Sequence, residues 1–266
     1  MKKRVFSSIV LIAILLPILI IGGLPFTIFV SIVGVMALYE LLKVHESRKE
    51  LPFLLKGVAY LLTIYFCLYN RESIEFYNHL DYKVVALFIF IFLLPMVFIN
   101  DNEKYNLSDA LFLVGSVLLI GFSFNLVIIT RNYDIQYLIY LVLITTITDT
   151  FALVTGKLIG EHKLCPKISP KKTIEGLIGG IFMGTFVASA YYHTVINTNV
   201  HLAIVVGLTM ILCCVGQIGD LVFSSIKRYY DVKDFSNLIP GHGGVLDRFD
   251  SLIFVELAFM LVFGIL

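Results

Sequence analysis

Apolar side chains form long uninterrupted stretches along this chain, and most polar side chains fall between them. Each stretch is roughly long enough to cross the hydrocarbon core of a bilayer, and most are apolar on every side, as helices surrounded by lipid are. The pattern therefore predicts an all-α, polytopic integral membrane protein with about nine transmembrane helices. The nine stretches are approximately 5–22, 24–42, 53–70, 83–100, 109–130, 137–156, 175–195, 201–222 and 250–266.

Composition supports a membrane protein. Of the 266 residues, 59% are hydrophobic and only 15% are charged, which is more apolar surface than a soluble domain of this size can use. The net charge of +1 says little about partners, and we expect a lipid bilayer but no nucleic acid. We divide the chain into N-terminal transmembrane helices, 1–108, and a C-terminal transmembrane catalytic part, 109–266.

The distribution of lysine and arginine predicts the orientation. With the N-terminus in the cytoplasm, 17 of the 20 Lys and Arg residues fall on the cytoplasmic side, as the positive-inside rule requires. The two longest polar loops, 157–174 and 223–249, then both face the cytoplasm. We expect a multi-pass protein of the cell (inner) membrane with its active site on the cytoplasmic side.

Carboxylates gather where the eighth apolar stretch ends and the ninth begins. If the helix continues through this point, Gln217, Asp220, Ser224 and Lys227 lie on one face, because they are spaced by three, four and three residues. Asp247 and Asp250 open the next stretch. Three anions at a membrane edge repel unless a cation lies among them, and oxygen ligands of this kind suit Mg²⁺.

Basic residues accompany these acids. They lie in the same segment, at Lys227, Arg228 and Arg248, and in the preceding cytoplasmic loop, which follows the membrane-embedded Asp149. Metal-binding acids beside phosphate-binding bases indicate phosphoryl or nucleotidyl transfer at a membrane face. The alternative for each charge alone is a solvated helix end or a topological anchor, but the whole set favours a site.

The polar segment also resembles a known family. The run Ser225-Ile-Lys-Arg, then Lys233-Asp234, then Pro240-Gly-His-Gly-Gly-Val-Leu-Asp-Arg-Phe-Asp250 is similar to the signature of phosphatidate cytidylyltransferases, within 225–250. The motif Ser169-Pro-Lys-Lys-Thr173, followed by Glu175 and Gly176, resembles a second segment of that family. The resemblance implies transfer of the cytidylyl group of CTP to phosphatidate, giving CDP-diacylglycerol and pyrophosphate in phospholipid biosynthesis.

Within that reading we assign roles to individual residues. Asp220 and Asp247 are expected to hold Mg²⁺, with Asp250 or Asp149 near a second cation or hydrogen-bonded to the ligands. Lys227 and Arg228 are expected to neutralise phosphates, so that Asp220, Asp247, Lys227 and Arg228 form the catalytic set. The expected substrate-binding residues are Ser169, Lys171, Lys172, Ser224, His242, Gly243, Gly244 and Arg248.

Two rival functions and one structural question stay open at this stage. The protein could be a CTP-dependent enzyme acting on another lipid phosphate or on a lipid alcohol, or a cation-coupled transporter, although the acids gather at the cytoplasmic ends. Gly176, Gly180 and Gly184 recur every four residues, which lets another helix approach closely. This glycine stripe is either a dimer seam or an internal contact, and we expect a homodimer.

Overall fold

The structure is a computed structural model, and it describes residues 13, 15–69, 82–99, 101–238 and 243–263. The chain divides into two compact units, each built from separated segments. Unit 1 is Met1–Tyr133 with Phe235–Leu246, and unit 2 is Asp134–Asp234 with Asp247–Leu266. The predicted boundary near residue 108 stays a prediction.

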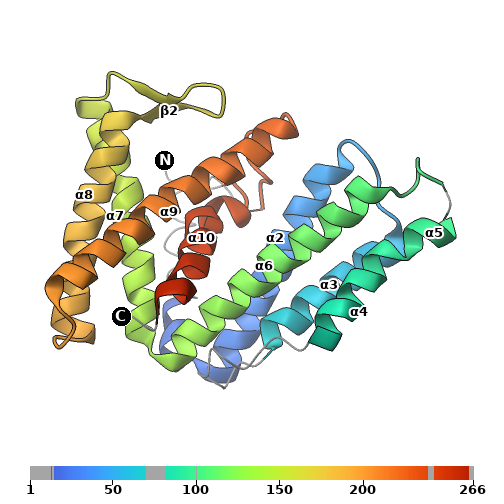
Figure 1. Cartoon of the computed structure of the whole chain (residues 1–266), viewed down its shortest axis with the longest axis horizontal. Helices are drawn as coiled ribbons and strands as arrows, with labels where there is room; N and C mark the ends of the chain where they lie inside the picture. Colours follow the sequence, from blue (N-terminus) through green and yellow to red (C-terminus); the bar gives the residue numbers. More distant parts are fainter. Residues whose placement is uncertain (1–12, 14, 70–81, 100, 239–242, 264–266) are drawn as a thin grey trace. The chain divides into compact units, whose positions relative to one another are not determined.

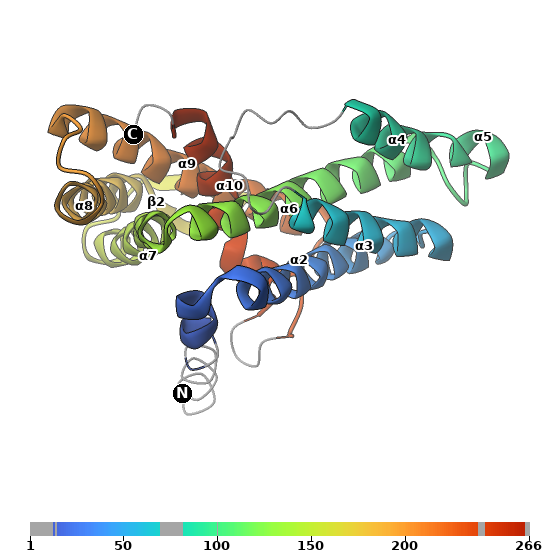
Figure 2. The same cartoon turned by 90° about the horizontal axis from the view of Figure 1, so that it is seen from below.

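Unit 1 is a helical bundle in which α2, α3 and α6 run side by side, with α4 against α6 (Figures 1 and 2). Between α4 and α5 the helix breaks at Leu94, because Pro95 has no N–H to donate and its ring clashes with the preceding turn. The helices of this unit are α2 (Gly23–Glu46), α3 (Phe53–Leu68), α4 (Tyr82–Leu93), α5 (Pro95–Ile99) and α6 (Leu107–Tyr133).

Unit 2 carries the two polar segments of interest. Helices α7 and α8 pack along each other, and α9 packs on both, while a two-stranded antiparallel hairpin lies at the start of α8 (Figure 1). The elements are α7 (Ile135–Leu158), β1 (Lys163–Cys165), β2 (Ser169–Thr173), α8 (Ile174–Tyr191), the π-helical turn η1 (Tyr192–Ile196), α9 (Leu202–Tyr229) and α10 (Leu246–Val262).

The mainly helical, membrane-protein character predicted from the apolar stretches is confirmed, and the hairpin is a small addition to it. Five helices are long and apolar enough to cross a membrane: Gly23–Glu46, Leu107–Tyr133, Ile135–Leu158, Ile174–Ile196 and Leu202–Tyr229. Phe53–Leu68 and Lys83–Ile99 are shorter apolar segments, and α10 has 17 residues. The expected stretch 5–22 lies largely outside the described residues, so the count of nine stays a prediction.

The glycine stripe is an internal contact within unit 2. A Cβ atom added at Gly180 would lie 2.6 Å from the backbone oxygen of Thr148, and one at Gly176 would lie 2.6 Å from that of Ala152. A Cβ atom added at Gly184 would likewise collide with the hydroxyl oxygen of Thr148. The stripe therefore lets α8 approach α7 closely, and the expected homodimer stays a prediction that no longer draws support from these glycines.

Candidate functional site

Helix α9 presents the predicted polar face. Because α9 runs without interruption from Leu202 to Tyr229, Gln217, Asp220, Ser224 and Lys227 lie on one side of it. Ser224 Oγ donates to Asp220 Oδ1 over 3.2 Å. The helix ends just beyond this face, where Asp231 adopts a left-handed φ of 58°. Val232 N–H then donates to Lys227 O, and Asp231 N–H donates to Arg228 O, which completes a Schellman cap.

The hairpin supplies a lysine to this face. Lys172 Nζ lies 2.7 Å from Asp220 Oδ2 and donates to Gln217 Oε1 over 3.2 Å. Successive side chains of a strand point to opposite sides, so the neighbouring Lys171 points away from Lys172, and its side chain is exposed. Of the two lysines in the motif, Lys172 is therefore the one that the fold brings to Asp220.

A second set of contacts ties α7 to α9 and α10. Gln217 Nε2 donates to Asp149 Oδ1 over 2.6 Å, and Ser251 Oγ donates to Asp149 Oδ2 over 3.4 Å. Gln217 is only 2% exposed, so its amide serves as a buried link between Lys172 and Asp149. Asp149, by contrast, is exposed at the surface of the unit.

The most enclosed ion pair of the site joins α9 to α10. Lys227 Nζ donates to Asp247 Oδ1 over 2.7 Å, and the two side chains are 10% and 5% exposed. A lysine that served only as a topological anchor would point to bulk water or lipid headgroups. Lys227 is instead directed into the unit, toward a carboxylate.

Three of the predicted metal ligands influence one another electrostatically. The negative charges of Asp220 and Asp149 both act on Asp250, and Lys227 acts on it with the opposite sign. Within the part of the chain that the structure describes, no three His, Cys, Asp or Glu side chains are grouped to hold one metal ion. Mg²⁺ usually needs only one or two protein carboxylates, with waters and substrate phosphates completing its shell. The all-oxygen donor set of this site fits that mode of binding.

The remaining predicted residues lie at the margins of this network. Arg228 donates to the backbone oxygens of Ile168, at 3.2 Å, and Val232, at 2.9 Å, so it ties the end of α9 to the hairpin loop. Ser169 begins β2 and Arg248 is exposed on α10. His242 lies outside the described residues, while Gly243 and Gly244 precede α10.

Three polar residues with clear contacts were missing from the predicted set. Gln217 was placed on the correct face but given no role, and Ser251 directly follows a predicted ligand. Glu40 was overlooked, although a carboxylate inside an apolar stretch is a recognisable signal because its burial is costly. Its partners lie in unit 1, with hydrogen bonds to Ser236, Val245 and Leu246.

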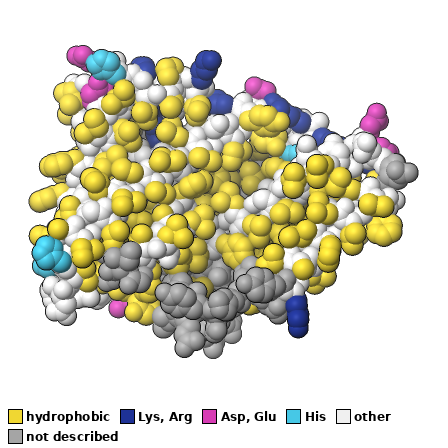
Figure 3. Space-filling view, in the orientation of Figure 1, with side chains coloured by type: hydrophobic (Ala, Val, Ile, Leu, Met, Phe, Trp, Pro, Cys, Tyr) yellow, Lys and Arg dark blue, Asp and Glu magenta, His cyan; other side chains and the backbone are white. Residues whose placement is uncertain are grey.

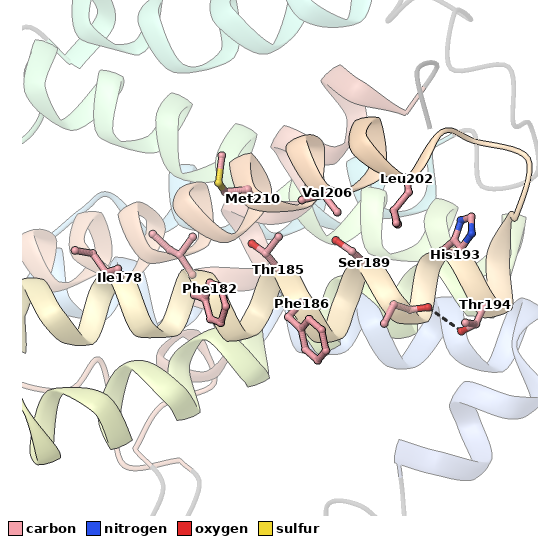
Figure 4. A pocket seen from close by; sticks show the side chains of 12 residues that line it. Ile178, Phe182, Thr185, Phe186, Ser189, His193, Thr194, Leu202, Val206 and Met210 are labelled. Carbon is pink, nitrogen blue, oxygen red and sulfur yellow. Dashed lines mark hydrogen bonds between the residues drawn. The ribbon is translucent and has the colours of Figure 1, made fainter.

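An apolar groove of about 720 Å³ lies between α8 and α9, away from these charges. Figure 4 shows Ile178, Phe182 and Phe186 of α8 along it, with Val206 and Met210 of α9 opposite. His193 and the hydroxyls of Thr185, Ser189 and Thr194 also line the groove, but most of its wall is apolar and suits hydrocarbon, and no lysine or arginine among the described residues lines it. The charged residues predicted for the site lie instead in a network of lysines, carboxylates and their polar neighbours, which we call the acid–lysine network: Asp149, Lys172, Gln217, Asp220, Ser224, Lys227, Asp247, Asp250 and Ser251.

Comparison with known proteins gives this network its context. The profile of the cytidylyltransferase family matches residues 2–266. The chain belongs to this family. A protein named phosphatidate cytidylyltransferase from Staphylococcus aureus (strain COL) is 38% identical over 256 residues, which cover 96% of each chain. Proteins of the same name from Staphylococcus haemolyticus and Staphylococcus saprophyticus are 37% and 35% identical, again over 96% of each chain.

Cytidylyltransferases are nucleotidyltransferases, an enzyme class that generally depends on a divalent metal. A member of the family needs cations that receive the phosphates of a nucleotide and carboxylates that hold a metal. Within the described residues of unit 2, the acid–lysine network brings lysines and carboxylates together, from α7, β2, α9 and α10. The resemblance read from the 225–250 signature is confirmed by the match over nearly the whole chain.

Proposed function

We propose that this protein transfers the cytidylyl group of CTP to phosphatidate, giving CDP-diacylglycerol and pyrophosphate, at the cytoplasmic side of the cell (inner) membrane. The observation that carries the proposal is the acid–lysine network, in which Lys172 pairs with Asp220 and Lys227 pairs with Asp247. We infer the substrates, CTP and phosphatidate, from the names of the relatives. The lysines and carboxylates of the network suit the binding of their phosphates.

The reaction brings together two anions. An oxygen of the lipid phosphate forms a bond to the α-phosphorus of CTP, and the bond from that phosphorus to the bridging oxygen of the β-phosphate breaks, so that pyrophosphate leaves. A phosphate monoester is largely a dianion at neutral pH, since its second pKa is near 6, and it needs no strong general base. Catalysis therefore rests on positioning and charge neutralisation.

The residues of the network match these two tasks. Lys172 and Lys227 each pair with a carboxylate, and each would exchange that partner for a phosphate oxygen. Asp220 and Asp247 would hold Mg²⁺, with Asp250 or Asp149 beside a second cation, and the metal would supply further charge neutralisation. Gln217 keeps Lys172 and Asp149 in position from its buried site on α9.

The lipid substrate requires the network to lie beside hydrocarbon. On the drawn face of unit 2, hydrophobic side chains cover α8 and α9, and charged side chains gather at the end with the hairpin (Figure 3). Phosphatidate in the membrane can thus present its phosphate to the network while its acyl chains stay in lipid.

An assay with purified protein in lipid nanodiscs tests the proposal. With CTP labelled at the α-phosphate, phosphatidate and Mg²⁺, we expect labelled CDP-diacylglycerol and an equal amount of pyrophosphate. Replacing phosphatidate with diacylglycerol should give no labelled lipid. Labelling of diacylglycerol instead of phosphatidate, or no labelled lipid from either, would contradict the proposal.

A further inference from the structure

Glu40 is a carboxylate in the interior of unit 1, on α2, and its exposed fraction is 0%. Helix α2 is long and apolar enough to cross a membrane. A carboxylate in such a position is costly unless its oxygens have partners, and it usually has a function. The partners of Glu40 therefore indicate what it does.

Every partner that we identify for Glu40 lies about 200 residues further along the chain, between the end of α9 and the first residue of α10. Oε1 accepts from Ser236 Oγ over 2.5 Å and from the backbone N–H of Val245 over 2.8 Å. Oε2 accepts from the backbone N–H of Leu246 over 2.8 Å. We call this arrangement the Glu40 clamp.

The clamp binds the start of α10. Leu246 is the first residue of that helix and Val245 precedes it, so both amides belong to the group that a helix leaves without an intrahelical acceptor. A negative charge at this end is also favoured by the helix dipole. These two amides are thus bound by a carboxylate of the protein itself and are not free to bind a substrate phosphate. In the proposed function, the lysines of the acid–lysine network bind the substrate phosphates instead.

Gly244 shows how closely the two segments approach. A Cβ atom at this position would lie 2.6 Å from Oε2 of Glu40 and 2.8 Å from Oε1. Both distances are far shorter than a carbon–oxygen contact allows, so a larger residue would displace the carboxylate. The absence of a side chain at Gly244, in the signature segment, therefore makes room for the Glu40 carboxylate on α2.

We infer that Glu40 is a positioning residue for the reaction, and this inference rests on the function proposed above. Asp247 is the residue after Leu246 in the first turn of α10. Because the amides of Val245 and Leu246 are held in place, the first turn of α10 is held in place as well. The position of this turn sets the direction in which the Asp247 side chain points. A residue of the N-terminal part thereby sets the geometry of a proposed metal ligand without touching substrate.

The substitution Glu40→Gln tests the clamp with little change in volume. The amide keeps one acceptor oxygen but replaces the other with an NH₂ group, which would face a backbone donor. We expect hydrogen exchange in the peptide containing Val245 and Leu246 to become at least tenfold faster. We also expect the Mg²⁺ concentration for half-maximal activity to rise at least threefold, with a lower kcat.

The two measurements separate the possible outcomes. The half-maximal Mg²⁺ concentration does not depend on the fraction of folded molecules, so a merely destabilised protein would leave it unchanged. Faster exchange with an unchanged Mg²⁺ midpoint would overturn the positioning role, and unchanged exchange would overturn the clamp itself. If the wild-type protein made no CDP-diacylglycerol, the proposed function would fail, while the exchange measurement would still decide whether the clamp exists.

Two further variants complete the experiment. Glu46→Gln, on the same helix, removes a carboxylate whose ion-pair partner is Lys56, and it should change neither measurement. Ser236→Ala removes one donor and keeps both amide contacts, so it should give smaller changes in the same direction. Should Glu40→Gln fail to fold, Ser236→Ala decides: changes in both measurements support the inference, and none overturns it.

Discussion

Lys227 and Asp247 form an ion pair that is nearly withdrawn from water, and its role can be tested by removing one charge. We predict that Lys227→Gln lowers the rate of CDP-diacylglycerol synthesis by more than tenfold, since losing a phosphate-directed charge in such a site should cost more than about 1.4 kcal/mol of transition-state stabilisation. The initial rate at saturating CTP, normalised to folded protein, measures this.

The normalisation matters because breaking a buried ion pair also destabilises a protein, by about 3–5 kcal/mol. Lys233→Gln provides the control, because Lys233 follows the same helix but is exposed. It should retain a rate within twofold of wild type. If Lys227→Gln also retained a rate within twofold of wild type, Lys227 would be a topological anchor and not a phosphate-binding residue.

The proposed metal ligands allow a second prediction. Asp220→Asn and Asp247→Asn should each abolish turnover per molecule of folded, membrane-inserted protein, because a neutral amide does not replace the charge that Mg²⁺ requires. Asp231→Asn is the matched control, since Asp231 has a left-handed φ of 58° that asparagine also tolerates. Near-normal activity in both site variants would refute the assignment.

Much of the acid–lysine network could be predicted from sequence because helical spacing is regular. Gln217, Asp220, Ser224 and Lys227 lie on one face once α9 is continuous, and that continuity is what the apolar stretch before them indicates. Glu40 could not be assigned in this way. Its partners are about 200 residues away, and no spacing rule reports which distant backbone amide a buried carboxylate meets.

At the level of elements, the sequence predicted helices better than their ends or partners. Pro95 divides the stretch 83–100 into α4 and α5, although the stretch looked long enough to span a membrane. The hairpin of β1 and β2 was predicted only as a loop, because strands of three and five residues leave little pattern. The glycine stripe was recognised, but its spacing indicated close packing without identifying α7 as the partner.

The contact between α7 and α8 leads to a third prediction. Gly180→Ala should lower the stability of unit 2 by about 1–3 kcal/mol, as overpacking typically does, because its Cβ would lie 2.6 Å from the backbone oxygen of Thr148. The chain contains no tryptophan, so unfolding in detergent is best followed with a thiol-reactive dye, in a background in which the other free cysteines, Cys67, Cys165 and Cys214, are replaced by alanine and the dye reports exposure of the buried Cys213.

Gly207→Ala is the control for this measurement. Gly207 also lies inside a helix, α9, but a Cβ there would have no atom within 4 Å. Alanine should therefore be neutral or stabilising, by up to about 1 kcal/mol, because it is the better helix former. Equal melting temperatures for the two variants would show that α8 does not depend on the glycine stripe.

At the scale of the whole molecule, the chain crosses between its two units around the signature segment. Phe235–Leu246 belongs to unit 1, whereas the residues before and after it belong to unit 2. A division of the sequence into consecutive parts could not anticipate this exchange, because apolar stretches report single helices and not how segments group. The Glu40 clamp gives the exchange a physical reason, since it fixes the returning segment to α2.

Membrane topology provides the last prediction. The hairpin precedes α8 and the polar end of α9 follows it, and both Ile174–Ile196 and Leu202–Tyr229 are long enough to cross a membrane. Two crossings return the chain to the side from which it started. The hairpin and the loop after α9 should therefore lie on one side of the membrane, and the short segment between η1 and α9 should lie on the other. The positions of the lysines and arginines predict that the hairpin side is cytoplasmic.

Single cysteines in a cysteine-free background test this arrangement at three exposed positions. Lys167→Cys in the hairpin and Asp234→Cys after α9 should react with a membrane-impermeant maleimide only after intact cells are opened. Asn199→Cys, between η1 and α9, should react in intact cells and serves as the positive control. Labelling of only one of the first two positions from outside would place Lys172 and the end of α9 on opposite sides of the bilayer. That outcome is incompatible with the ion pair between Lys172 and Asp220, and so with a single site for CTP and the lipid phosphate.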